Sequence, residues 1–188
     1  MRISGGGARG ITLQVPRGDA VRPATDGMRQ ALFSSLGARV VDARFLDLFA
    51  GSGAYGLEAL SRGAVGGVFV EQNAKTAGCV RQNIAAVCKS LRRPTDGLVV
   101  VQADARSVPL GGGEVPDLVF IDPPYDLIAE ITPALFARLS DTLASKPDTL
   151  VCFEAPGELE LAPTGWTLLK RIGKGARQPT VSIFRREG

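Results

Sequence analysis

Residues 47–56 read Asp47-Leu48-Phe49-Ala50-Gly51-Ser52-Gly53-Ala54-Tyr55-Gly56, and this stretch decides the fold. It ends an apolar run, contains the spacing GxGxxG and leads into a helical pattern near residues 54–62. Glycines in this spacing permit a tight turn after a strand, and the N–H groups that begin the helix point into the crevice beside it. We therefore predict a strand, a ligand-binding loop and a helix.

Apolar runs and helical patterns alternate on both sides of this stretch, which predicts a parallel sheet with helices on both faces. The expected helices lie near 54–62, 73–90 and 126–144. Two further strands, Trp166–Ile172 and Thr180–Phe184, are joined by a loop too short for a crossover helix, so they are expected to pair antiparallel. Five parallel strands followed by an antiparallel hairpin form the Rossmann-like class I methyltransferase fold. The five expected parallel strands are Phe45–Phe49, Val65–Val70, Leu98–Val101, Leu118–Ile121 and Leu150–Phe153.

The residues before this sheet predict an extension and one helix. Residues 9–15 alternate weakly and are expected to form a strand of an N-terminal β-hairpin that bends at Gly5-Gly6-Gly7. Thr25 and Asp26 are good N-caps for a helix that Gly37 terminates. We expect one methyltransferase domain over residues 1–188, with the hairpin extension in 1–24 and the cofactor-binding catalytic core in 25–188.

Composition excludes several kinds of chemistry. The chain of 188 residues is 45% apolar and 22% charged, contains no histidine and has three cysteines without a CxxC pair. A Ser-His-Asp triad and a His-liganded metal are therefore excluded, and no metal is expected. No apolar run approaches the roughly 20 residues that span a bilayer, and no secretion signal is evident. We expect a monomeric cytoplasmic protein with reduced thiols.

The net charge of +3 is unevenly distributed. Residues 1–44 carry seven Arg and three Asp, and residues 165–188 carry six basic residues and one Glu, whereas the intervening segment is acidic. Basic ends on an acidic body are compatible with binding of a polyanion through the termini. They are equally compatible with ordinary solvated surface.

Acidic residues near the glycine loop indicate which cofactor it binds. Glu71 lies 20 residues after Gly51, at the end of the second strand, where a carboxylate can bind a ribose diol. These features alone fit both NAD and S-adenosylmethionine (SAM). Asp47 favours SAM, because a carboxylate there can meet the cationic amino end of a methionine moiety and a pyrophosphate has no need of it. Asp104 ends the third strand, where it can bind an adenine edge.

The candidate catalytic residues follow the fourth strand and read Asp122-Pro123-Pro124-Tyr125. The amine of a nucleobase is a poor nucleophile because its lone pair is delocalised into the ring. Asp122 and the Pro123 carbonyl can each accept one N–H and so favour the tetrahedral geometry that attack on a methyl group requires. Tyr125 can stack on the ring, worth roughly 1–3 kcal/mol. This chemistry needs no histidine.

The chain resembles the RsmD-like guanine-N2 methyltransferases of small-subunit (16S) ribosomal RNA. The matching segments follow the family's order and span nearly the whole sequence. They are Met1-Arg2-Ile3-Ser4-Gly5, Arg22-Pro23-Ala24-Thr25-Asp26, Arg29-Gln30-Ala31-Leu32-Phe33, Leu46 to Gly53, Gly56 to Ala64, and Asp122-Pro123-Pro124-Tyr125. The chain departs from the family at Gly27, at the Gly5–Ala8 turn and at Tyr55, where a smaller or aliphatic residue is usual.

The resemblance implies that SAM is the cofactor, that the substrate is ribosomal RNA or a small-subunit assembly particle, and that the N-terminal hairpin helps to bind RNA. It implies catalytic roles for Asp122, Pro123 and Tyr125, which hold the guanine amine. The expected cofactor-binding residues are Asp47, Phe49, Gly51, Ser52, Gly53, Glu71, Gln72, Asp104 and Ala105. The expected RNA-binding residues are Arg2, Arg9, Arg17 and Arg22.

Three other functions remain open at this point. An adenine-N6 DNA methyltransferase uses the same Asp-Pro-Pro-Tyr cluster, although the chain has no evident domain to read base edges in a DNA groove. An NAD-dependent oxidoreductase would use the same glycine spacing but lacks an obvious acid pair. A SAM-fold RNA-binding assembly factor without activity is the third, and the intact Asp122 and Tyr125 argue against it.

Overall fold

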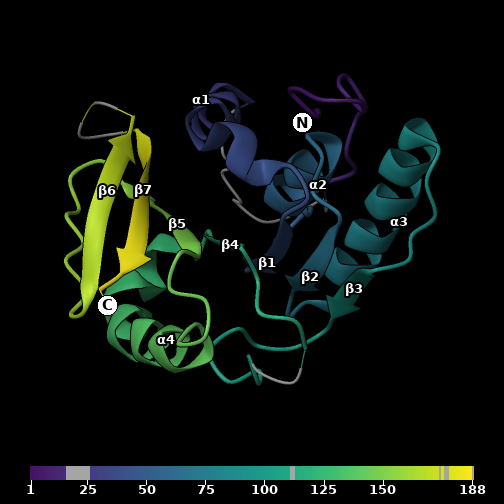
Figure 1. The fold of residues 1–188 in the computed structure, drawn as a ribbon. Helices are drawn as coiled ribbons and strands as arrows, with labels where there is room; N and C mark the ends of the chain where they lie inside the picture. The colour runs from purple at the N-terminus through teal and green to yellow at the C-terminus, as the bar shows by residue number, and fades with distance from the viewer. Residues whose placement is uncertain (16–25, 111–112, 174, 176–177, 188) are drawn as a thin grey trace.

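The computed structural model describes residues 1–15, 26–110, 113–173, 175 and 178–187. Figure 1 shows a central sheet with helices on both sides. In chain order the described elements are α1 (Asp26–Leu36), η1 (Gly37–Val40), β1 (Arg44–Leu48), α2 (Ala54–Ser61), β2 (Gly66–Val70), α3 (Ala74–Leu91), β3 (Leu98–Val101), β4 (Leu118–Ile121), η2 (Tyr125–Leu127), α4 (Ile128–Thr142), β5 (Leu150–Pro156), β6 (Trp166–Ile172) and β7 (Pro179–Arg186).

The seven strands form one sheet in the order β3-β2-β1-β4-β5-β7-β6. Strands β1 to β5 are parallel, and β7 pairs antiparallel with both β5 and β6, which confirms the predicted strand directions. The last strand in the sequence is thus inserted between two earlier ones. Between β3 and β4 the chain returns from one edge to the centre, so β1 and β4 flank the topological switch point. Open α/β sheets bind ligands at that point, beyond the carboxyl ends of the strands.

Two apolar clusters fill the two faces of the sheet. Helices α1, α2 and α3 cover one face and α4 covers the other (Figure 1). On the first face the rings of Phe45 and Phe69 meet edge to face at 5.1 Å, beneath α2. On the second face Phe136 of α4 packs against Phe153 and Trp166. Strands β1, β2, β4 and β5 are therefore largely buried on both sides, as the pattern predicts, whereas β3 at the edge of the sheet exposes Val99.

Helix α2 lies unusually close to the sheet because of Gly56. A Cβ built on Gly56 would lie 2.4 Å from Cε1 of Phe69 and 2.5 Å from Cε2 of Phe45. No real side chain tolerates such contacts, so the third glycine of the motif is required for packing of the helix on the strands. That packing fixes the direction of α2 and of the loop before it.

The N-terminal segment does not form the strand expected over residues 9–15. Among residues 1–15 the structure has a single isolated antiparallel bridge, between Arg2 and Thr12. The turn itself is held by the end of α2, where the Gly7 N–H donates to the Ser61 carbonyl at 2.7 Å and the Ala8 N–H donates to Ser61 Oγ at 2.9 Å. Beyond the turn the two arms pair only briefly, through the Ile3 N–H to the Ile11 carbonyl at 3.0 Å and the Leu13 N–H to the Met1 carbonyl at 3.1 Å.

Cys79, Cys88 and Cys152 are free thiols, and the latter two are buried. None of the helices in the described part of the chain is long and apolar enough to cross a membrane.

Candidate functional site

The glycine loop connects β1 to α2 at the switch point. Gly51 and Gly53 have positive φ angles of 55° and 78°, and Phe49 adopts 61°, a conformation rare for a residue with a side chain. The loop turns tightly, since the Gly53 N–H donates to the Ala50 carbonyl at 2.7 Å. The carbonyl of Ser52 accepts from the Asn83 amide of α3 at 2.9 Å, so the loop is tied to the second helix as well.

Asn83 also connects this loop to the N-terminal segment. Its Oδ1 accepts from the Gln14 N–H at 2.8 Å, and its Nδ2 donates to the Gln14 carbonyl at 3.0 Å. The sulfur of Met1 accepts from Ser52 Oγ at 3.4 Å. The side chain of Asn83 is buried, so one amide group links three parts of the chain that are distant in sequence.

Asp47 is buried beneath the loop. Its Oδ2 accepts from the Gly56 N–H at 2.9 Å. Burial raises the pKa of Asp47 to about 8, an effect that the Gly56 hydrogen bond opposes and the nearby Glu71 carboxylate reinforces. A cation that bound beside this group would favour its ionised form.

Glu71 follows β2 and contacts the loop through both of its carboxylate oxygens. Oε2 accepts from the Gly51 N–H at 3.0 Å, and Oε1 accepts from the Asn73 N–H at 2.8 Å. Each oxygen keeps a lone pair for a ligand hydroxyl. The structure therefore brings Glu71 to the glycine loop, whereas Gln72 is exposed in the bend that precedes α3.

Asp104 follows β3 and is bound by an arginine that the sequence pattern did not indicate. Arg106 Nη2 donates to Asp104 Oδ2 at 2.7 Å, and the Arg106 N–H donates to Oδ1 at 2.8 Å. These bonds hold the pKa of Asp104 below its usual value. Arg106 also lies 3.6 Å from Glu130 of α4. Ala105 is buried beside this pair.

A cavity of about 120 Å³ lies between these loops and α4. It is lined by Phe49, Arg106, Glu130, Ile131, Ala134, Leu135 and Arg138. Its walls combine an aromatic ring from the β1 loop with a basic side chain from the β3 loop. It therefore borders the switch point on the side of the sheet that α4 covers.

The tetrapeptide Asp122-Pro123-Pro124-Tyr125 begins directly after β4. Pro123 is buried, Asp122 is half-buried, and Tyr125 has 39% of its surface exposed at the start of η2. Burial raises the pKa of Asp122 well above its usual value, and the nearby Glu154 and Asp47 carboxylates raise it further. The tetrapeptide and the glycine loop thus end neighbouring strands, β4 and β1.

Sequence reasoning missed three polar side chains beneath this tetrapeptide. Tyr55 Oη donates to Glu154 Oε2 at 2.5 Å, and both side chains are buried. Arg29 of α1 is fully buried and donates to the Arg2 carbonyl at 2.7 Å and to Asp26 at 2.5 Å. Glu154 could have been identified from the sequence, because it follows the fifth predicted strand just as Asp104 and Asp122 follow the third and the fourth.

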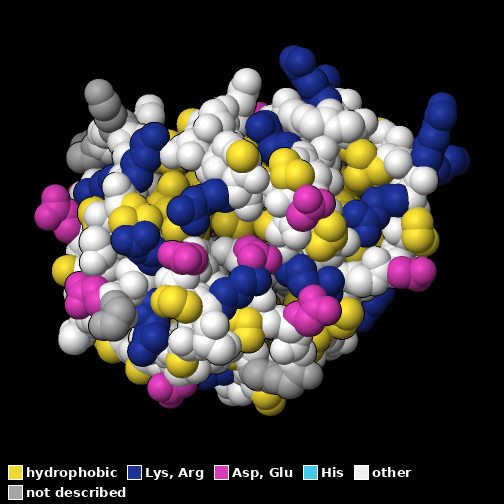
Figure 2. All heavy atoms as spheres, in the orientation of Figure 1, with side chains coloured by type: hydrophobic (Ala, Val, Ile, Leu, Met, Phe, Trp, Pro, Cys, Tyr) yellow, Lys and Arg dark blue, Asp and Glu magenta, His cyan; other side chains and the backbone are white. Residues whose placement is uncertain are grey.

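The candidate RNA-binding arginines lie only partly within the described residues. Arg2 and Arg9 are exposed on the N-terminal segment, and Arg17 and Arg22 lie outside the described residues. Figure 2 shows basic side chains spread over one face of the molecule and interleaved with acidic ones. Among the described residues no cluster of acidic or sulfur ligands could hold a metal ion.

Comparisons with known proteins identify similar chains over the full length. The family model described as conserved hypothetical protein 95 matches residues 1–183. The chain is 35% identical to ribosomal RNA small subunit methyltransferase D of Escherichia coli K12 over 189 residues, covering 100% of this chain and 90% of that protein. It is 28% identical to the putative rRNA methyltransferase YlbH of Bacillus subtilis, and the match covers both chains completely.

Solved structures share the fold over the same extent. The putative methyltransferase yhhF of Escherichia coli superposes with a TM-score of 0.77 at 34% identity, covering 100% of this chain and 98% of that one. A hypothetical protein of Thermus thermophilus gives a TM-score of 0.73 at 32% identity, with 100% and 99% covered.

Proposed function

We propose, from the premise that the chain belongs to the conserved hypothetical protein 95 family, that it is a SAM-dependent methyltransferase acting on the N2 amine of a guanine in small-subunit (16S) ribosomal RNA. The observation that carries this proposal is the position of Asp122-Pro123-Pro124-Tyr125. It follows β4 at the switch point, beside the glycine loop that follows β1. An amine-holding cluster and a nucleoside-binding loop therefore face the same crevice.

The residues around the loop fit SAM. Asp47 is a buried carboxyl whose ionised form lacks a close ion-pair partner among the described residues, and the cationic amino end of the cofactor would supply one. Glu71 would hold the ribose hydroxyls, with Gln72 beside it. Gly51, Ser52 and Gly53 would offer backbone to the methionine moiety. When bound, the cofactor supplies an activated methyl group.

The adenine would lie near Asp104 and Ala105, against Phe49. Arg106 already donates two hydrogen bonds to Asp104 Oδ2, so we propose that Asp104 fixes the loop after β3. The Ala105 backbone would then contribute to adenine binding. The cavity lined by Phe49 and Arg106 supports this position for the adenine.

The tetrapeptide would hold and orient the guanine. The Asp122 carboxylate and the Pro123 carbonyl each accept one N–H of the amine, which stabilises the positive charge that develops on nitrogen. Pro123 and Pro124 carry no N–H of their own and stiffen the backbone. Tyr125, exposed at the mouth of the site, stacks on the base. The base must leave its stack to reach this pocket, which favours a structured RNA substrate.

We further propose that the chain acts as one domain and as a monomer, and that Arg2 and Arg9, with Arg17 and Arg22, contact RNA phosphates. The exposure of Arg2 and Arg9 on a segment tied to the glycine loop supports an RNA contact near the cofactor.

Methyl transfer from tritiated SAM tests the function. Small-subunit particles, naked 16S ribosomal RNA and duplex DNA are each incubated with the wild type, with Asp122→Ala, and with Asp126→Ala, an exposed aspartate in the same turn as a control. We expect transfer to guanine N2 in ribosomal RNA, abolished by Asp122→Ala alone. Label found only in adenine of DNA would establish the alternative, an adenine-N6 DNA methyltransferase. Absence of transfer with retained RNA binding would favour an assembly factor.

A further inference from the structure

Glu154 occupies the same place on β5 that Asp122 occupies on β4. The last registered pair between these parallel strands joins Ile121 to Phe153, and Asp122 and Glu154 each follow by one residue. Neighbouring strands lie about 5 Å apart, and residues in equivalent positions point to the same face. The two carboxyl groups therefore lie side by side on the face that α1 and α2 cover.

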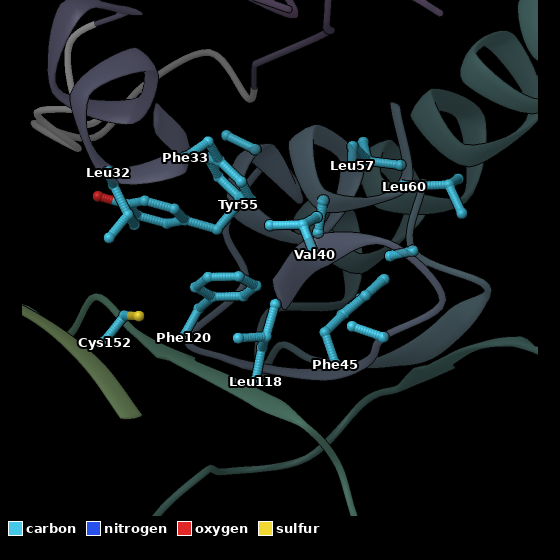
Figure 3. Packing of buried hydrophobic residues seen from close by; sticks show 14 of the residues in the cluster. Leu32, Phe33, Val40, Phe45, Tyr55, Leu57, Leu60, Leu118, Phe120 and Cys152 are labelled. Atoms are coloured by element: carbon cyan, nitrogen blue, oxygen red, sulfur yellow. The ribbon is translucent and has the colours of Figure 1, made fainter. Parts of the chain in front are cut away.

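Tyr55 fixes the Glu154 carboxyl group. Its hydroxyl donates to Oε2 at 2.5 Å, a length typical of a strong bond to an anionic oxygen. The Tyr55 ring in turn stacks on Phe120, with centroids 5.5 Å apart and an angle of 13° between the planes. Figure 3 shows the two rings lying over one another, with the hydroxyl at the far end of the tyrosine. Phe120 is two residues before Asp122, so the strand that carries Asp122 also supports this tyrosine.

One buried cation faces the carboxyl pair: the Arg29 guanidinium lowers the pKa of both Asp122 and Glu154. The titratable groups that face the pair are Asp47 of β1, Tyr55 of α2 and Arg29 of α1. On the other side of Glu154, its partner in β7 is Val181, which carries no charge. Burial raises the pKa of both carboxyl groups, and the Glu154 carboxylate beside it raises that of Asp122 further. The Tyr55 bond opposes this for Glu154 and has no counterpart at Asp122 in the described part of the chain.

We propose that Glu154 is a positioning residue for methyl transfer: its carboxylate, fixed by Tyr55, lies beside Asp122 and makes Asp122 the acceptor of the proton that the methylated amine releases. This inference rests on the proposed function. Tyr55 stabilises the negative charge on Glu154, and that charge increases the affinity of Asp122 for a proton. A carboxylate whose pKa is raised in this way is a stronger base than an ordinary aspartate.

The step is a proton transfer. One N–H bond of the methylated amine breaks with its electron pair left on nitrogen, and an O–H bond forms on Asp122. The nitrogen thereby loses its positive charge, and the Asp122 proton passes to water when the product leaves the half-buried site. Neither Glu154 nor Tyr55 needs to contact the substrate.

The pH dependence of kcat separates this role from a purely structural one. Glu154→Gln keeps the shape and the Tyr55 bond but removes the charge, and Tyr55→Phe removes the bond that stabilises the charge. Both are expected to move the acid limb of the kcat profile to lower pH and to lower the plateau value of kcat, because Asp122 becomes a weaker base. Glu158→Gln, on the exposed side of the following turn, is the matched control and should leave the profile unchanged. A uniform loss of rate with an unmoved acid limb would overturn the proposal.

An NMR titration of Asp122 tests the same pair of carboxyl groups and does not require enzyme activity. In the full-length protein labelled with ¹³C at aspartate carboxyl carbons, the Asp122 resonance is assigned by its loss in Asp122→Asn and followed with pH. Its apparent pKa should fall in Glu154→Gln and stay in place in Glu158→Gln. An unchanged pKa in Glu154→Gln refutes the inference even if the wild type methylates RNA. A wild type that transfers no methyl group refutes the proposed function, and the titration still decides whether Glu154 controls Asp122.

Discussion

The free energy of unfolding of the wild type should fall as pH rises from 4 to 8, and replacement of Asp47 by asparagine should remove this fall. The carboxyl group has a pKa of about 8 in the folded protein, against 3.8 when exposed. In the unfolded chain it therefore ionises freely above pH 4, while the folded protein retains the proton up to pH 8. Each pH unit between these values costs the folded wild type about 1.4 kcal/mol, which amounts to about 3 kcal/mol between pH 5 and pH 7. Above pH 8 the penalty becomes constant.

Urea unfolding of wild type and Asp47→Asn at pH 5, 6, 7 and 8 measures this difference. Asparagine can still accept the Gly56 N–H, and its buried NH₂ group adds a cost that does not vary with pH. The slope with pH, rather than the absolute difference, is therefore the diagnostic quantity. Asp96→Asn, on an exposed turn, is the matched control for the same replacement away from the glycine loop. A stability difference between wild type and Asp47→Asn that stays constant from pH 5 to pH 8 would show that Asp47 ionises normally and refute the reasoning.

Three further outcomes are expected. Gly56→Ala should destabilise the protein by about 1–3 kcal/mol in urea unfolding, because its Cβ would overlap Phe69, whereas Gly78→Ala in α3 meets nothing within 4 Å and should be neutral or stabilising. Asn83→Ala should weaken SAM binding roughly tenfold by calorimetry, since it removes one hydrogen bond to the glycine loop and two to the N-terminal segment; unchanged affinity would show that the loop holds its shape alone. Tyr125→Ala should raise KM for RNA by roughly tenfold or more while Tyr125→Phe does not, and equal effects of both would exclude stacking.

The sequence predicted the sheet well because its core strands are short apolar runs, which Asp47 interrupts in β1. The predicted bounds of β3 and β4 agree with the structure to the residue, and β5 continues three residues beyond the prediction, through Glu154 to Pro156. Periodicity cannot show that extension, since it comes from antiparallel pairing with β7, a long-range interaction. Local alternation favoured a strand over residues 9–15, and the structure has there only the bridge between Thr12 and Arg2, because the pairing with residues 1–3 is short.

The candidate site was predictable where residue type and strand position coincide. Asp47, Glu71 and Asp122 all follow or end strands at one edge of the sheet, as the alternation of strands and helices requires. The bond between Arg106 and Asp104 and the bond between Tyr55 and Glu154 depend on side-chain directions that no pattern in the sequence specifies. Their roles, like those of the tetrapeptide, stay predictions until the experiments above are done.

The insertion of β7 between β5 and β6 has a consequence for synthesis of the protein. A ribosome releases the chain from its N-terminus, so β6 emerges before the strand that binds it, and within the described sheet β7 is its sole neighbour. Until β7 arrives, β6 and the open edge of β5 each present unpaired N–H and C=O groups, a situation that favours pairing with other chains. Loss of β7 by premature termination would therefore release β6 as well. Strand β7 therefore joins β6 to the rest of the sheet, and folding of this part of the protein should depend on whether residues 179–186 are made.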